Sequence, residues 1–378
     1  MITLAVRFVI LDATARYVMA TGKTLVAGFG RAGRGVIGLL FVVMLVRRHL
    51  SSLVKLTILG AAGHALLPLP TPYSTAIWGW ASWVAGFALM FWGRYKAVER
   101  FSKPMAILLG GCLAAAALLS KPDVGSLLTG AFTPAIPESR GLYGPFLVII
   151  AVMSAAAGST GNLKYSAYVH ERGWRDVSFL RTQRIDLLLS GCGIFAMLAL
   201  IQIAAAGALR PQGILVGEIE DLIPMFSQVL GDGGRIVLAA TLWSVVFTSY
   251  LGGTGLVLMM TDAYHRHLRP SEPDPSADQD EGSAHLPAFR WLTLYTFLSP
   301  LYVFMTDWNP IGLVLAQSAS SVLGLPVIIF IILRLTSNRK VMGEHANGWL
   351  TNVILAAAAL TTIYLSFEAG LEYLQGSR

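Results

Sequence analysis

A long apolar segment between Tyr143 and Arg175 stops halfway along its length and then resumes. The interruption reads Gly158-Ser159-Thr160-Gly161-Asn162. A membrane span needs about 20 apolar residues in an unbroken helix, because the hydrocarbon core offers no water to bond backbone N–H and C=O groups. Two glycines around two hydroxyl residues favour irregular backbone over helix. The sequence therefore predicts one membrane span that is broken in its middle.

Two interpretations of this break fit the residues. Unwound backbone at membrane depth is tolerated only inside protein or beside a water-filled cavity, where freed carbonyls and half-helix dipoles can hold an ion or a polar substrate. This favours the substrate site of a transporter. Alternatively, Gly158 and Gly161 let two helices pack closely, while Ser159 and Thr160 bond to carbonyls one turn back.

The composition sets the class of protein. The chain is 55% hydrophobic and only 13% charged, with a mean hydropathy of +0.63. Soluble domains carry about 25% charged residues, so we predict an integral membrane protein. Cytoplasmic loops rich in Lys and Arg explain the net charge of +7 without a nucleic-acid partner. Cys112 and Cys192 both lie in apolar runs, which predicts buried thiols rather than a disulfide or a zinc site.

Ten membrane spans are predicted from the apolar segments. Alternate loops between them, at 21–34, 94–103, 172–184, 262–290 and 334–340, hold 17 of the 28 Lys and Arg residues, whereas the opposite loops hold four. This asymmetry places the first set of loops in the cytoplasm. The acidic, proline-rich segment 270–287 is predicted to be a disordered cytoplasmic loop. The spans lie near residues 2–20, 35–68, 75–93, 104–120, 144–170, 185–208, 235–261, 289–307, 311–334 and 349–370.

Charged residues occur inside the first two spans. Asp12 and Arg16 are four residues apart, so they share a helix face and are predicted to pair. The second span is unusually long and carries Arg47, Arg48 and Lys55, which predicts a long tilted helix with its polar face turned inward. The alternative is two shorter apolar segments with the arginines at an interface.

Four parts of the chain carry motifs that occur together in one known family. They are Thr21-Gly22-Lys23-Thr24-Leu25, Gly161-Asn162-Leu163 with Tyr165-Ser166-Ala167, Leu313-Val314-Leu315-Ala316-Gln317 with Leu325-Pro326, and Ser337-Asn338-Arg339-Lys340-Val341-Met342-Gly343-Glu344. In this order along the whole chain, they resemble the NRAMP family of divalent-metal transporters. The resemblance implies a leucine-transporter-type fold, which is an all-α membrane protein built from two inverted five-helix repeats. Residues 1–120 would then be the remainder of the first repeat, 144–334 the second repeat, and 349–370 a terminal helix, all in one multi-pass domain.

The sequence departs from the family pattern in three ways. The Asp-Pro-Gly-Asn motif of the family's first helix does not occur, and ten spans would place both termini outside, so we expect an upstream helix that this sequence lacks. The family's Met-Pro-His-Asn is replaced by Ser159, Thr160, Gly161 and Asn162, which leaves oxygen donors that suit hard ions such as magnesium. No acidic residue occurs between Asp12 and Glu99, which argues against proton symport.

These observations predict a secondary transporter that moves divalent metal cations by alternating access. Lys164 lies two residues past Asn162, about 200° round a helix, and is expected to face away from the ion. If it faced inward, an anionic or zwitterionic substrate would fit better. The predicted ligands are the side chains of Ser159, Thr160, Asn162 and Gln317 and the carbonyls of Ala156 and Ala157.

Two rival functions stay open. One is an amino-acid or other organic-solute transporter of the same fold, and the other is a degenerate relative that transports nothing. An enzyme is not expected, because no cluster of His, Asp, Glu or Cys has catalytic spacing, and no cofactor is expected either. The predicted surroundings are the lipid bilayer of a bacterial inner membrane, without an obligatory protein partner.

Overall fold

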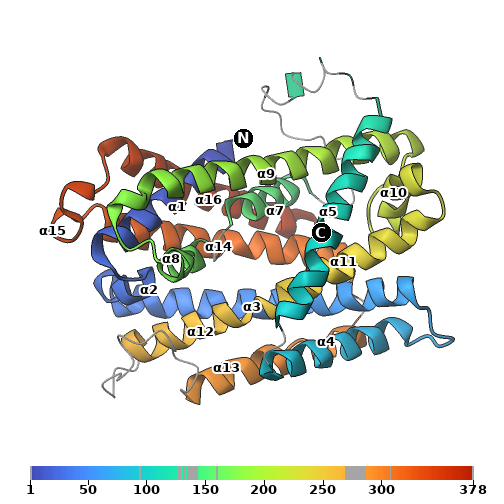
Figure 1. Cartoon of the computed structure of the whole chain (residues 1–378), viewed down its shortest axis with the longest axis horizontal. Coiled ribbons are helices and arrows are strands. Elements are labelled where there is room, and N and C mark those ends of the chain that lie inside the picture. The colour runs from blue at the N-terminus through green and yellow to red at the C-terminus, as the bar shows by residue number, and fades with distance from the viewer. Residues whose placement is uncertain are drawn as a thin grey trace.

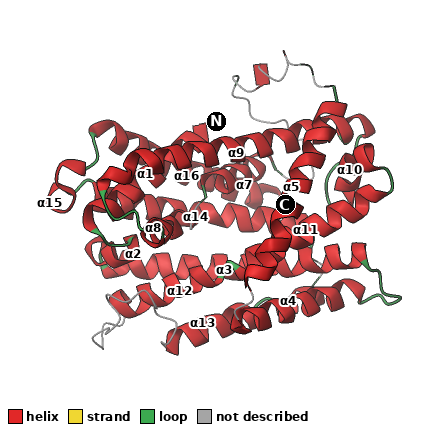
Figure 2. Ribbon diagram, in the orientation of Figure 1, coloured by secondary structure: helices red, strands yellow, loops and turns green. Residues whose placement is uncertain are grey.

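The computed structural model describes residues 2–92, 95–121, 144–158, 161–268, 287–306 and 308–376, together with positions 123, 125, 129, 130 and 133. Regular structure in these residues is entirely helical (Figure 2). Each of the ten predicted segments coincides with one helix or with two consecutive helices. The predicted loop at 270–287 lies outside the described residues except for Pro287.

The N-terminal half contains four long helices. They are α1 (Ile2–Thr21), α3 (Arg34–Leu66), α4 (Ser74–Trp92) and α5 (Tyr95–Leu119), with the short α2 (Leu25–Gly28) between the first two. The helix α3 is continuous over 33 residues, or about 50 Å, which exceeds the hydrocarbon thickness of about 30 Å. Arg48 within it is only 4% exposed. The prediction of one long helix with an inward polar face is therefore confirmed.

The C-terminal half contains two interrupted helices and several continuous ones. The pair α7 (Pro145–Ala157) and α8 (Gly161–Glu171) forms the predicted broken span, and α11 (Gly233–Leu251) and α12 (Thr254–Ala263) form a second interrupted stretch that the sequence analysis did not predict. The remaining elements are α9 (Leu180–Ala208), α10 (Ile223–Leu230), α13 (Pro287–Leu298), α14 (Pro310–Thr336), α15 (Arg339–Met342) and α16 (Trp349–Gly376).

The helix α14 lies in the middle of the bundle (Figure 1), where it packs against α1, α3, α7 and α16. On one side α3 separates it from α4 and α13, and on the other side α9 crosses over α1. A cluster of buried apolar side chains joins these central helices. Its largest members include Ile10, Tyr17, Leu40, Ile328 and Ile332. The chain is therefore organised around α14, with the broken span α7–α8 directly beside it.

Three helical stretches among the described residues are long and apolar enough to cross a membrane, namely Arg34–Leu66, Val177–Gln212 and Gly233–Leu268. A bent pair, Arg339–His345 with Trp349–Leu365, would make a fourth. The count of ten spans stays a prediction. The prediction for the cysteines holds for Cys112, which is buried, but is wrong for Cys192, which is exposed on α9. An apolar run does not by itself show which of its side chains face the protein interior.

Candidate substrate site at a broken helix

The break between α7 and α8 is a true end of one helix and start of another. Gly158 follows the last residue of α7 with φ +80° and ψ 0°, the left-handed conformation that glycine adopts without steric cost. A Cβ at this position would also lie 2.9 Å from Asn162 Oδ1. The amide of Gly161 then donates to Gly158 O over 2.7 Å, which closes the turn before α8 begins. Only glycine fits position 158 without strain.

Both carbonyls predicted to be ligands already accept hydrogen bonds. Ala156 O accepts from Arg7 Nη1 of α1 over 3.0 Å, and Ala157 O accepts from Asn162 Nδ2 over 3.0 Å. Each carbonyl oxygen has two lone pairs, so Ala157 O, which bonds a neutral amide, keeps capacity for a further partner, whereas Ala156 O already meets a cation. The break therefore already holds a positive charge, the guanidinium of Arg7, against oxygen atoms released by the end of α7.

The side-chain oxygen of Asn162 is the most informative atom at the break. Asn162 is 1% exposed, and its Oδ1 has no hydrogen-bond partner among the described residues. The amide orientation is determined by its neighbour, because Ala157 O can only accept and so requires the NH₂ group to face it. A buried oxygen without a donor costs about 1–3 kcal/mol, which a bound cation would recover.

The structure gives less information on the other three predicted side-chain ligands. Ser159 and Thr160 lie outside the described residues. Gln317 lies half-buried in α14, which packs along α7. Ligand roles for these three side chains stay predictions.

Lys164 does not point to the carbonyls of the break. Its Nζ donates to Gly252 O over 3.0 Å, so the side chain reaches the turn between α11 and α12. The position therefore agrees with the expectation that Lys164 faces away from Ala156 and Ala157, but its charge stays inside the protein.

Sequence reasoning missed Arg7, although a signal was available. An arginine in an apolar span is costly unless it faces protein, so its presence in the first predicted span pointed to an interior partner. What the sequence could not supply was the partner, a backbone carbonyl on a helix 149 residues away.

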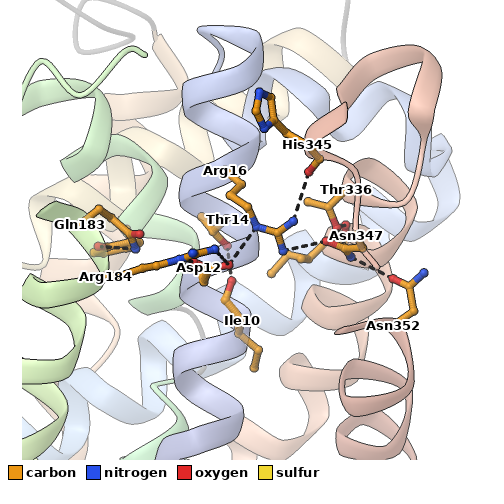
Figure 3. Close-up of polar contacts among 12 residues, drawn as sticks. Ile10, Asp12, Thr14, Arg16, Gln183, Arg184, Thr336, His345, Asn347 and Asn352 are labelled. Atoms are coloured by element: carbon orange, nitrogen blue, oxygen red, sulfur yellow. Dashed lines mark hydrogen bonds and ion pairs between the residues drawn. The ribbon is translucent and has the colours of Figure 1, made fainter. Parts of the chain in front are cut away.

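The same helix, α1, is fixed by a buried polar network (Figure 3). Asp12 accepts from Arg16 Nε over 2.9 Å and from Arg184 Nε over 2.7 Å, which confirms the predicted Asp12–Arg16 pair. Arg16 also donates to His345 O and to Asn347 Oδ1. Asn347 Nδ2 in turn donates to Thr336 Oγ1. The network joins α1 to α9 and to the segment between α14 and α16.

The N-terminus of α14, at the other end of this helix from Thr336, is also held by hydrogen bonds. Asn309 Oδ1 caps the helix by accepting from Gly312 N, while its Nδ2 donates to Gly217 O and to Glu218 Oε1. Partial burial, together with the carboxylates of Glu220 and Asp221, raises the pKa of Glu218 above its ordinary value, and the bond from Asn309 opposes that shift.

Among the described residues, no three or more His, Cys, Asp or Glu side chains lie together as a metal-binding group. The cation site of neutral oxygen atoms at the break therefore stays a prediction. Neutral oxygen donors suit hard cations and leave the charge of the ion largely uncompensated.

A helical bundle of this kind, with a span broken at its centre, defines an integral membrane protein of the leucine-transporter type of fold. The family model described as Natural resistance-associated macrophage protein-like matches residues 1–371, and the chain belongs to this family, NRAMP.

Similar proteins agree with this assignment. The divalent metal cation transporter MntH of Aeromonas hydrophila is 23% identical over 285 residues, which is 71% of this chain and 63% of that protein. MntH of Nostoc sp. is 23% identical over 307 residues, or 74% and 64% of the two chains. The chain thus spans less than two thirds of the length of these relatives. Both relatives are described as transporters, in agreement with the expectation that the chain is not an enzyme.

The solved structure of the Eremococcus coleocola manganese transporter in complex with an aromatic bis-isothiourea substituted compound superposes with a TM-score of 0.66 at 15% identity. The superposition covers 97% of this chain and 77% of that one. At this identity the likeness shows the fold, and the leucine-transporter-type architecture expected from the sequence is confirmed.

Proposed function

We propose that this chain is the helical bundle of a secondary transporter that moves divalent metal cations across a bacterial inner membrane by alternating access. The observation that carries the proposal is the Oδ1 atom of Asn162, buried at the break without a hydrogen-bond donor among the described residues. The Nδ2 atom of the same side chain donates to Ala157 O, and the carbonyl one residue earlier, Ala156 O, already binds the cationic Arg7. The relatives' description as divalent metal cation transporters supports the same substrate class.

The ligand set of the proposed site is the one expected from the sequence. Asn162 Oδ1 and the carbonyls of Ala156 and Ala157 provide oxygens from α7 and α8, Ser159 and Thr160 add hydroxyls, and Gln317 approaches from α14. Such a site is made only of hard oxygen donors, so it favours magnesium over the softer manganese and iron. In this proposal, residues 1–120 are the remainder of the first repeat, residues 144–334 form the second repeat, and residues 349–370 form the terminal helix.

Arg7 acts in this proposal as a tethered cation. Its guanidinium occupies Ala156 O when no metal is bound, and it must leave that oxygen when a metal enters, because two cations at one carbonyl repel each other. The exchange keeps a positive charge at the break in both states. In the state without metal, Arg7 therefore avoids the free-energy cost of leaving buried oxygen atoms without a partner.

An organic-solute transporter is the second candidate, and Lys164 favours it. Lys164 lies two residues past Asn162 and its amine binds Gly252 O. If the amine turned toward the break, it would pair with a carboxylate of a zwitterionic solute. The same charge raises the free energy of a nearby dication.

Uptake into proteoliposomes by the full chain tests these candidates. Radioactive manganese is the tracer, and magnesium, manganese and an amino-acid mixture are the competitors. We expect magnesium to compete and amino acids to have no effect.

Variants of the proposed ligands give a second test. Asn162→Ala and Gln317→Ala are expected to lose at least about tenfold in uptake, a loss of ~1.4 kcal/mol. Ser166→Ala is the matched control, because Ser166 lies one turn further along α8 and donates only to Leu163 O. Amino-acid uptake that ignores metals would support the organic-solute candidate, and no uptake of either would support a degenerate relative.

A further inference from the structure

A small cavity lies beside the turn between α11 and α12, on the side of α13. It is lined by the polar side chains of Arg48, Thr293 and Thr296 and by the rings of Phe87, Tyr250 and Phe297. It has room for about one water-sized molecule. The cavity is separate from the break between α7 and α8, and the proposed transport of cations makes no use of it.

The polar groups of this cavity are hydrogen-bond donors in excess of acceptors. Arg48 Nε donates to Thr296 Oγ1 over 3.2 Å, so the Thr296 oxygen is an acceptor already and its own hydrogen remains to be donated. Thr293 Oγ1 is buried without a hydrogen-bond partner among the described residues. The two threonines are three residues apart on α13 and share one helix face. The Tyr250 hydroxyl donates away from this group, to Trp83 O.

Positive charge also exceeds negative charge at this turn. Lys55 Nζ donates to Ser249 O over 3.1 Å and Lys164 Nζ to Gly252 O over 3.0 Å, so both lysines bind backbone carbonyls. The three cations are close enough to influence one another electrostatically. None of the ion pairs formed among the described residues includes Arg48, Lys55 or Lys164.

The backbone is shaped to admit the guanidinium. A Cβ at Gly253 would lie 2.2 Å from Arg48 Nη1, so a glycine at this position is what lets Arg48 approach the turn. A buried charge is expensive unless it is paired and hydrogen-bonded. The site thus combines a buried guanidinium, two hydroxyl donors and two nearby ammonium groups with no described carboxylate to balance them.

We propose that this cavity binds a small monovalent anion of the halide class. Arg48 supplies the charge, the hydroxyls of Thr293 and Thr296 supply two hydrogen bonds, and Lys55 and Lys164 raise the local potential. An anion here neutralises one of the three cations around the turn between α11 and α12.

Thermal unfolding of the purified full chain tests the proposal with chloride as the probe. The protein is titrated with sodium chloride against sodium gluconate at constant ionic strength. We expect a saturable rise of about 2 °C in Tm with chloride. The rise is expected to disappear in the double variant Thr293→Val with Thr296→Val. It should persist in Thr241→Val, where the hydroxyl removed is also fully buried but donates to Val237 O.

A second measurement covers variants that fold poorly. Crystals of the unmodified protein grown in bromide are expected to show one anomalous peak among Arg48, Thr293 and Thr296. A Tm that is equal in chloride and gluconate would overturn the proposal and indicate that the cavity holds water. The same chloride response in the double variant as in Thr241→Val would overturn it too.

Discussion

The two interrupted helical stretches both present backbone carbonyls to side chains, but the side chains that meet these carbonyls differ. At the break between α7 and α8, the carbonyl of Ala156 accepts from Arg7 while Asn162 Oδ1 has no donor among the described residues. At the turn between α11 and α12, the carbonyls of Ser249 and Gly252 accept from two lysines, and Arg48 lies against the turn as well. The first site therefore has more hydrogen-bond acceptors than donors, and the second site has more donors than acceptors. An interruption frees carbonyls in both places, and the side chains that arrive decide which sign of ion fits.

The backbones of the two interruptions differ in a way that matches this contrast. Gly158 adopts positive φ and ends α7, so the oxygens behind it leave the helical pattern. Gly252 and Gly253 keep right-handed conformations, and the stretch from Gly233 to Leu268 continues as one candidate span. The left-handed Gly158 ends α7, whereas the two right-handed glycines leave α11 and α12 within one continuous stretch and make room for a guanidinium.

The largest expected effect concerns the helix that delivers Arg7 to the break. Asp12→Ala removes the carboxylate shared by Arg16 and Arg184, leaving Arg16 buried without its ion pair. We expect the free energy of unfolding to fall by about 3–5 kcal/mol, measured by denaturant or thermal unfolding in detergent. Asp186→Ala is the control, since Asp186 pairs with Arg172 at an exposed position, and its loss should cost less than about 1 kcal/mol. Equal losses in both variants would contradict a structural role for the Asp12 network.

The next effect separates the two glycines of the break. Gly158→Ala forces a side chain into left-handed backbone and against Asn162 Oδ1, so we expect a stability loss of about 1–3 kcal/mol together with reduced metal uptake. Gly161→Ala is the matched control, because a Cβ there has nothing within 4 Å, and stability should stay equal or rise by up to about 1 kcal/mol. If both glycines tolerate alanine, the break has no strict geometry and the comparison with the second turn loses its basis.

A smaller effect is expected on metal affinity when the charge of Arg7 is removed. Arg7→Gln removes the charge that competes for Ala156 O, so we expect the half-saturating metal concentration in proteoliposome uptake to fall about tenfold, or ~1.4 kcal/mol. Arg7→Lys keeps the charge and should stay near the unmodified protein. A Gln variant that binds metal no more tightly than the Lys variant would show that Arg7 is only a structural donor.

The positive charge of Lys164 at the turn between α11 and α12 should weakly lower the metal affinity at the break between α7 and α8. Lys164→Gln removes an ammonium group held at Gly252 O, two residues along α8 from Asn162. We expect metal affinity to improve about threefold, or ~0.6 kcal/mol, and the gain to shrink in high salt because screening already weakens the repulsion. A loss of affinity would instead make Lys164 part of the substrate site and favour an organic anion or zwitterion.

The sequence predicted the elements of this fold better than it predicted their contacts. Apolar length and glycine placement were enough to predict the long helix α3 and the break at Gly158, because both follow from local backbone chemistry. The Asp12–Arg16 pair followed from helical periodicity. In contrast, Arg7 at Ala156 O and Lys164 at Gly252 O join residues 149 and 88 positions apart. The turn at Gly252–Gly253 was missed since two glycines in an apolar run do not reveal which side chain approaches them.

The smallest expected effect lies away from both turns, at Glu218, and serves as their common control. Burial and the carboxylates of Glu220 and Asp221 raise the pKa of Glu218, so the folded state binds this proton more tightly than the unfolded state does. Stability from this group is therefore present below its ordinary pKa and is lost as the pH rises through the raised value. Because Glu218 is largely exposed, solvent screens this effect. Glu218→Gln should thus be slightly more stable than the unmodified protein at pH 7, by less than about 0.5 kcal/mol, with the difference vanishing near pH 4. Thermal unfolding at the two pH values measures this difference in stability.

Metal uptake and the chloride response should not change in Glu218→Gln, because Glu218 contacts Asn309 at the start of α14 and contacts neither turn. A change in either measurement would mean that the loop before α14 is coupled to the ion sites.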